Sequence, residues 1–229
     1  MPPVQERRLV IFDCDGVLVD SEGISNAVLA RMLGEQGLTM TVAESRRAFQ
    51  GLLLSDVLLQ AQERLGRELP EDWLARFEQL RAEAFHRELE PVPGAARAVE
   101  LILAAGFAVC VASQGKLEKT QLSLTLTGLR HLFAENTLFS AYQVAHGKPH
   151  PDLFLHAART MRARPAECVV VEDTPSGVLA AVAAGMRVLG YAADSEESAL
   201  CEAGAETFDS LEQLPGLLAN DLRRARQDT

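Results

Sequence analysis

The sequence predicts an α/β protein with a parallel β-sheet at its core and a second, helical unit inserted near the N-terminus. Three observations support this prediction. Short apolar runs alternate with helical patterns along most of the 229 residues. One stretch, from residue 20 to 91, has helical patterns only, and polar residues follow several of the apolar runs. Strands that alternate with helices form parallel sheets that are buried on both faces.

Five apolar runs are predicted to be the strands of the sheet. Short continuous runs of this kind are typical of buried strands. They cover residues 9–12, 107–112, 137–139 (the weakest run), 169–171 and 187–191. Helical patterns between them cover residues 95–105, 151–162 and 175–184, and Gly106 and Gly185 stand where C-terminal caps belong. This order predicts a Rossmann-like core, in which ligands bind at the carboxyl ends of the strands.

The stretch from residue 20 to 91 is predicted to be a helical cap domain. Its helical patterns cover residues 23–36, 41–49, 54–65 and 71–90. Pro91-Val92-Pro93-Gly94 has the composition of a linker that returns to the core. We therefore expect a core domain of residues 1–19 and 92–229, and a cap domain of residues 20–91 over the end of the first strand. The polar tail, residues 220–229, is expected to fray.

The composition limits the classes of partner. A formal net charge of −10 at pH 7 disfavours binding to nucleic acid and to anionic membranes. The four cysteines show no C-x-x-C spacing, so neither a disulfide framework nor a zinc site is expected. The chain has no signal-peptide pattern and no apolar run near the ~20 residues of a membrane span. We expect a cytoplasmic protein that is a monomer or a weak homodimer, with no nucleic-acid or membrane partner.

The most informative stretch runs from Val10 through Asp13-Cys14-Asp15-Gly16. An apolar strand here ends in two carboxylates two residues apart, and positions i and i+2 of a strand point to the same side. Two like charges beside a core are costly unless something pairs them. The pair predicts a cation site, acid–base chemistry, or both, and Gly16 permits a sharp turn. By itself, the pattern is also compatible with a polar turn after a strand.

Three further polar groups follow predicted strands. They are Ser113-Gln114-Gly115, then Gly147-Lys148-Pro149, then Glu172-Asp173-Thr174. Each has an ordinary explanation in isolation: Ser113 as a helix cap, Lys148 as a solvated loop lysine, and the acids as favourable charges at a helix N-terminus. Together, at the carboxyl ends of one parallel sheet, they predict a single site with acids, a hydroxyl and a lysine.

With these four motifs in order, the chain resembles the phosphatase and phosphomutase branch of the haloacid dehalogenase superfamily with a helical cap. The resemblance covers nearly the whole chain. It implies a Mg²⁺-dependent phosphatase that works through an aspartyl-phosphate, with Asp13 as nucleophile and Asp15 as general acid and base. It implies that Ser113, Gln114 and Lys148 bind the phosphoryl oxygens. The implied Mg²⁺ ligands are Asp13, the Asp15 backbone carbonyl, Asp173, and Glu172 directly or through water.

Two cap positions bear on the choice between phosphatase and mutase. Mutases like β-phosphoglucomutase carry a histidine five residues after the aspartate at position 20, where this chain has Ser25. They also carry an arginine three residues after a cap-loop glycine; if that glycine is Gly51, this chain has Leu54. The bacterial sugar-phosphate phosphatases, such as those acting on 6-phosphogluconate, are what the chain most resembles in the stretches Phe49-Gln50-Gly51, Phe139-Ser140 and Lys148-Pro149. A small phosphorylated metabolite is therefore the expected partner, with Gln50 and Gly51 contacting it.

Two alternatives stay open at this point. A phosphosugar mutase resembling β-phosphoglucomutase would need a second phosphate clamp, which Arg46 or Arg47 could supply. A non-catalytic protein that binds phosphorylated metabolites would use the same site without turnover. A test for metal-dependent turnover separates the second alternative from an enzyme.

Overall fold

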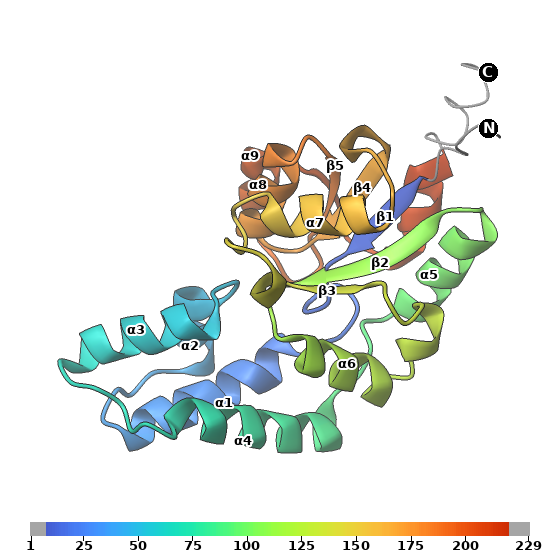
Figure 1. The fold of residues 1–229 in the computed structure, drawn as a ribbon. Helices are drawn as coiled ribbons and strands as arrows, with labels where there is room; N and C mark the ends of the chain where they lie inside the picture. Colours follow the sequence, from blue (N-terminus) through green and yellow to red (C-terminus); the bar gives the residue numbers. More distant parts are fainter. Residues whose placement is uncertain (1–7, 220–229) are drawn as a thin grey trace.

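The computed structural model describes residues 8–219, and within them six strands form one parallel sheet (Figure 1). In spatial order the strands are β3 (Leu138–Ser140), β2 (Ala108–Ser113), β1 (Leu9–Phe12), β4 (Cys168–Glu172), β5 (Arg187–Tyr191) and β6 (Glu206–Phe208). The strand order changes direction between β1 and β4, which lie next to each other in the middle of the sheet. The predicted α/β fold class with a parallel sheet is confirmed.

Helices cover both faces of the sheet. They are α5 (Ala95–Ala104), α6 (Leu117–Leu126), α7 (Asp152–Thr160), α8 (Pro175–Ala183) and α9 (Glu197–Ala203). Alternate strand residues point to opposite faces. Phe12 and Val111 pack on the α5 and α6 side, whereas Ile11 and Cys110 pack against α7, α8 and α9. Because both faces are buried, these strands are continuous apolar runs rather than alternating ones.

Four helices follow β1 and form a separate group on the side of its carboxyl end (Figure 1). They are α1 (Glu22–Glu35), α2 (Val42–Phe49), α3 (Leu54–Leu65) and α4 (Trp73–Glu88). Their apolar faces meet in a core of their own, which includes Met32, Trp73 and Phe77. A capping box starts α2: the Thr41 N–H donates to Glu44 Oε2 at 2.7 Å, and the Glu44 N–H donates to Thr41 Oγ1 at 3.1 Å.

The two segments that join this helical group to the sheet are paired with each other. The Asp20 N–H donates to the Glu90 carbonyl, and the Val92 N–H donates to the Leu18 carbonyl, both at 3.0 Å. Val19 makes isolated β-bridges to both Asp15 and Pro91. The helical group therefore connects to the sheet at one place, directly beside Asp15.

Strand β6 and helix α9 are not among the elements that the sequence patterns predict. Strand β6 has only three residues, of which Glu206 is exposed, and it lies at the edge of the sheet. It has no apolar run because an edge strand need not be buried on both faces. The tail predicted to fray lies outside the described residues.

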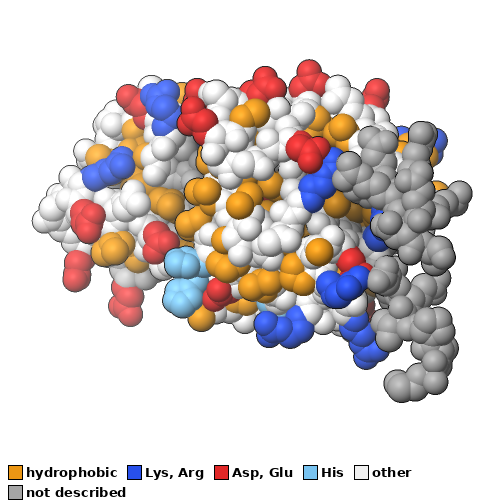
Figure 2. Space-filling view, turned by 90° about the horizontal axis from the view of Figure 1, so that it is seen from above, with side chains coloured by type: hydrophobic (Ala, Val, Ile, Leu, Met, Phe, Trp, Pro, Cys, Tyr) orange, Lys and Arg blue, Asp and Glu red, His pale blue; other side chains and the backbone are white. Residues whose placement is uncertain are grey.

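The outer surface mixes side-chain types. On the face seen from above, hydrophobic side chains gather along the middle, with acidic and basic side chains around them (Figure 2). Between residues 8 and 219, the structure has no helix with the length and apolar character needed to span a membrane.

Candidate active site

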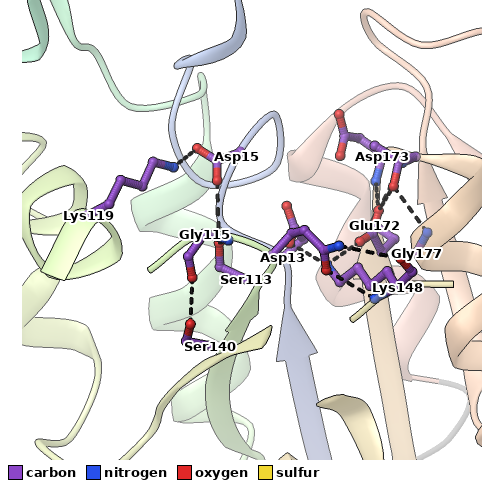
Figure 3. A network of polar contacts seen from close by, with 12 residues as sticks. Asp13, Asp15, Ser113, Gly115, Lys119, Ser140, Lys148, Glu172, Asp173 and Gly177 are labelled. Carbon is purple, nitrogen blue, oxygen red and sulfur yellow. Dashed lines mark hydrogen bonds and ion pairs between the residues drawn. The ribbon is translucent and has the colours of Figure 1, made fainter. Parts of the chain in front are cut away.

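The polar groups predicted at the strand ends lie together where the strand order changes direction (Figure 3). Asp13 directly follows β1, and its N–H donates to the Val171 carbonyl of β4 at 2.9 Å. Ser113 is the last residue of β2 and Glu172 the last residue of β4. Open parallel sheets bind ligands at such a point, because the loops on either side turn to opposite faces and leave a crevice.

Lys148 forms a buried ion-pair network with two carboxylates. Its Nζ donates to Asp13 Oδ1 and to Glu172 Oε1, both at 2.5 Å. Burial lowers the pKa of Lys148, but the two carboxylates outweigh it, so the net shift is upward. Burial raises the pKa of Asp13 to about 7; Lys148 opposes that shift, and Glu172 and Asp15 add to it. The ammonium is therefore held charged against the predicted nucleophile.

Glu172 has contacts at both of its carboxylate oxygens. While Oε1 accepts from Lys148, Oε2 accepts from the Asp173 N–H, the Thr174 N–H and Thr174 Oγ1, each at 2.9 Å. Thr174 also caps α8, and a Cβ at Gly177 would collide with the Glu172 carboxylate. These contacts tie Glu172 to Lys148 and to the start of α8. Its contact with a metal ion, direct or through water, stays a prediction.

Asp173 is the carboxylate whose surroundings best fit a cation. Its side chain is buried, and Oδ1 has no hydrogen-bond partner. Gly16, at φ +76°, lies so close that a Cβ there would collide with the Asp173 carboxylate. Burial, together with the charges of Glu172 and Asp13, raises the pKa of Asp173 well above its usual value. When all three buried carboxylates are ionised, their charge exceeds that of the one lysine, and a hard divalent ion would supply the missing positive charge.

The residues present fit Mg²⁺ as a partial ligand set. Within the described part of the chain, no three His, Cys, Asp or Glu side chains form a group that could hold a metal ion. The predicted set combines two carboxylates, of Asp13 and Asp173, with the backbone carbonyl of Asp15. Mg²⁺ is usually bound through one or two carboxylates together with water and substrate phosphate, so two are enough.

Asp15 has different partners from Asp13. It accepts hydrogen bonds from Lys119 Nζ and Ser21 Oγ, and more weakly from Ser113 Oγ at 3.4 Å. Burial raises the pKa of Asp15, but Lys119 and Ser21 outweigh it, so the net shift is downward. Sequence reasoning missed Lys119. A signal was available, since Lys119 lies in the first turn of α6, the helix that follows Ser113.

The segment after β2 is hydrogen-bonded both to Ser140, at the end of β3, and to the loop that carries Lys148. Ser113 Oγ accepts from the Gly115 N–H at 3.0 Å, and Ser140 Oγ donates to the Gly115 carbonyl at 2.7 Å. The Gln114 side chain accepts from the Lys148 N–H at 3.0 Å and donates to the Lys148 carbonyl at 3.4 Å. Gln114 therefore holds the loop that carries Lys148.

A pocket between the helical group and the sheet is lined by most residues of this site, but not by Ser113 or by Asp173, which lines a second cavity together with Gly16 and Asp20. The first pocket encloses about 910 Å³, part of which is open solvent. Its wall includes Asp13, Asp15 and Lys148 on one side and Gln50 and Gly51 on the other. The structure thus places both predicted cap residues in the same pocket as the predicted nucleophile.

The positions that distinguish mutases also line this pocket. Ser25 and Leu54 both form part of the wall. Neither side chain carries a positive charge. Arg46 Nη2 donates to the Asp194 carbonyl at 3.2 Å and Arg46 Nε donates to Gln50 Oε1 at 3.4 Å. Neither Arg46 nor Arg47 is among the residues that line the pocket. Arg81 of α4 does line it, and sequence reasoning missed this residue.

Comparison with known proteins identifies relatives over most of the chain. A family model described as haloacid dehalogenase-like hydrolase matches residues 7–185. The 6-phosphogluconate phosphatase of Escherichia coli (strain K12) is 34% identical over 211 residues, which cover 91% of this chain and 93% of that protein. Hexitol phosphatase A of the same organism is 30% identical over 220 residues, covering 89% and 91%.

Solved structures of haloacid dehalogenase-like proteins are also similar to this chain. A haloacid dehalogenase-like protein of unknown function from Agrobacterium tumefaciens str. C58 has a TM-score of 0.79 and 34% identity, covering 94% of this chain and 99% of that one. A HAD family hydrolase from Deinococcus radiodurans R1, with bound phosphate and sodium, has a TM-score of 0.76 and 32% identity, covering 93% and 96%.

Proposed function

This chain belongs to the haloacid dehalogenase-like hydrolase family and is a phosphoric monoester hydrolase, and from that premise we propose a Mg²⁺-dependent phosphatase of small phosphorylated metabolites. The proposed substrate is a sugar phosphate or a sugar-acid phosphate, and the proposed intermediate is an aspartyl-phosphate. The observation that carries the proposal is the pocket in which Asp13, paired with Lys148, lies beside the separately paired Asp15.

Asp13 is the proposed nucleophile. Its carboxylate oxygen attacks phosphorus as the bond to the leaving oxygen breaks, so the phosphoryl group moves to Asp13. Lys148 lies 2.5 Å from Asp13 Oδ1, where its charge also stabilises the negative phosphoryl oxygens. When bound at Asp13, Asp173 and the Asp15 carbonyl, Mg²⁺ supplies charge that neutralises two approaching anions and orients the phosphoryl oxygens.

Asp15 is the proposed general acid and base. Its proton goes to the leaving oxygen in the first step, and in the second step it takes a proton from the water that attacks phosphorus and frees Asp13. Lys119 and Ser21 favour the ionised form of Asp15, which suits the second step. An anionic phosphoryl group close to Asp15 raises its affinity for a proton, which suits the first.

Hydrolysis is favoured over the phosphosugar mutase reaction, in which the phosphoryl group moves to another position of the sugar. A mutase holds a second phosphate while the first is transferred, and mutases like β-phosphoglucomutase carry a phosphate-binding arginine in the cap loop and a histidine five residues after the aspartate at position 20. At these positions this chain has Leu54 and Ser25, which supply no charge, and the arginine that does line the pocket, Arg81, lies on α4 instead. A non-catalytic binding protein is disfavoured because Asp13, Asp15, Lys148 and Asp173 are all present.

Residues 20–91 are proposed to be a cap that closes over the substrate. The paired linkers beside Asp15 are its only covalent connections and its natural hinges. Gly51 lies close to α8: a Cβ at residue 51 would be 3.3 Å from Ser176 Oγ. Closure would exclude stray water from the phosphoenzyme, and opening would release the product.

The test measures release of inorganic phosphate from p-nitrophenyl phosphate by the purified protein, with Mg²⁺ and with EDTA. We expect EDTA to abolish turnover and Asp13→Asn to abolish both turnover and the acid-stable, base-labile phosphoenzyme. Ser198→Ala, which removes a surface hydroxyl on α9, is the matched control and should keep the wild-type rate. Full activity in EDTA would overturn the metal assignment, and a fully active Asp13→Asn would overturn the nucleophile.

A further inference from the structure

Four cationic side chains line the catalytic pocket: Lys116, Lys119, Lys148 and Arg81. Three of them have acidic partners in the structure. Lys119 and Lys148 pair with the carboxylates of the catalytic site, and Lys116 pairs with Glu78 at 2.6 Å. The Arg81 guanidinium makes no hydrogen bond and no ion pair with any residue between 8 and 219. It is the pocket cation whose donors remain available.

Arg81 is held in place by aromatic rings. Its guanidinium carbon lies 5.0 Å from the centroid of the Phe77 ring and 6.0 Å from that of Phe85, both on α4. Such contacts orient a guanidinium but leave its N–H donors unused. A partly buried charged group without hydrogen-bond partners is costly, so a site of this kind is suited to a ligand that supplies the partners.

We propose that Arg81 binds the carboxylate of a phosphorylated sugar acid, at the end of the substrate remote from its phosphoryl group. The inference rests on the proposed phosphatase function and narrows its substrate class. A guanidinium presents a planar pair of donors that matches a carboxylate in geometry and charge. A hydroxyl of a neutral sugar would engage fewer donors and leave the charge unpaired.

The acids near Arg81 already have partners of their own. Asp15 accepts from Lys119 and Ser21, and Glu22 Oε2 accepts from Asn26 Nδ2 at 3.2 Å. Glu78, whose charge also acts on Arg81, pairs with Lys116 at 2.6 Å. Burial, followed by the charge of Asp15, raises the pKa of Glu22, which favours its neutral form. Repulsion of an incoming carboxylate by these groups is therefore reduced.

The experiment compares 6-phosphogluconate with glucitol 6-phosphate, which differ only in a carboxylate or a CH₂OH group at C1. We expect the wild-type kcat/KM to be higher for the acid. Arg81→Gln should lower kcat/KM for the acid about 10- to 100-fold, mainly through KM, because a charged hydrogen-bond pair is lost. The same variant should change kcat/KM for glucitol 6-phosphate and p-nitrophenyl phosphate by less than about threefold, since neither offers a carboxylate.

Arg81→Lys keeps the charge but loses the planar donor pair. Its kcat/KM for the acid should therefore fall between the values for the wild type and for Arg81→Gln. Arg76→Gln, which removes an exposed arginine of α4 paired with Glu35, is the matched control and should match wild type on every substrate. Urea denaturation checks that each variant is folded, and Arg81→Lys carries the test if Arg81→Gln does not fold.

Each other outcome overturns a defined part of the proposal. Equal losses on all three substrates would show that Arg81 acts through Asp15 rather than on the substrate carboxylate. No loss on the acid would place its carboxylate elsewhere. A wild-type enzyme with no preference for the acid would refute the substrate class but leave the phosphatase function intact. Failure to hydrolyse even p-nitrophenyl phosphate would instead overturn the proposed function.

Discussion

Replacing Lys148 with methionine tests the central ion-pair network of the site. Lys148 Nζ lies 2.5 Å from both Asp13 Oδ1 and Glu172 Oε1, and the side chains of these three residues are 3%, 8% and 1% exposed. Removal of one partner from a buried ion pair leaves an uncompensated charge and costs about 3–5 kcal/mol. We expect Lys148→Met to lower the free energy of unfolding by about this amount, a large share of the ~5–15 kcal/mol typical of a protein.

The second expected effect is on catalysis. Loss of one preorganised donor to transition-state charge slows an enzyme by about 10²- to 10³-fold. Adding Glu172→Gln to Lys148→Met should restore about 1–3 kcal/mol of stability, because it removes the buried charge left unpaired. The double variant should not recover kcat, because no cation returns to the phosphoryl site. Stability and activity are thereby separated in one pair of proteins.

Stability is measured by urea denaturation in EDTA, and kcat with p-nitrophenyl phosphate and Mg²⁺. Lys116→Met is the control for stability: its pair with Glu78 is also short, at 2.6 Å, but the two side chains are 43% and 29% exposed. We expect it to cost less than about 1 kcal/mol, as for other solvent-accessible pairs. Equal losses for Lys148→Met and Lys116→Met would refute the argument from burial, and a fully active Lys148→Met would refute its role in catalysis.

Three further predictions concern chemistry and specificity. Asp15→Asn should slow hydrolysis of an alkyl phosphate about 10²- to 10⁴-fold but affect p-nitrophenyl phosphate less, because its leaving group needs little protonation; equal effects in a leaving-group series would argue against general acid catalysis. Gln50→Ala should change kcat/KM by about 2- to 10-fold on some sugar phosphates and spare p-nitrophenyl phosphate, and a uniform change across a substrate panel would show that Gln50 does not select. With β-glucose 1-phosphate, coupled enzyme assays should detect inorganic phosphate and little glucose 6-phosphate, since Ser25 and Leu54 supply no second phosphate clamp; rapid isomerisation would restore the mutase interpretation.

Local patterns were sufficient for most of the fold. The central strands are short apolar runs because both of their faces are buried, and this leaves a mark within a few residues of sequence. Strand β5 begins and ends where the pattern predicts, and β1 does as well. Strand β6 leaves no such mark: Glu206 and Thr207 are polar, and the segment is a strand because it pairs with β5.

The residues of the site divide in the same way. Asp13, Ser113 and Glu172 are placed by local sequence, because each directly follows or ends a strand and the strands of a parallel sheet end at one edge. Which groups pair within that edge is a long-range property. Lys148 reaches Asp13 across 135 residues of sequence, and Lys119 reaches Asp15 across 104.

Sequence by itself therefore determined the fold class, the order of the central strands, and the residues Asp13, Ser113 and Glu172 at the edge of the sheet. The tertiary structure decided their partners: Lys148 with Asp13 and Glu172, Lys119 with Asp15, and Arg81 in the pocket wall without an acidic partner among the described residues. The physical reason is that strand and helix patterns depend on neighbours a few positions apart. Charge pairing depends instead on which side chains packing brings within hydrogen-bond distance.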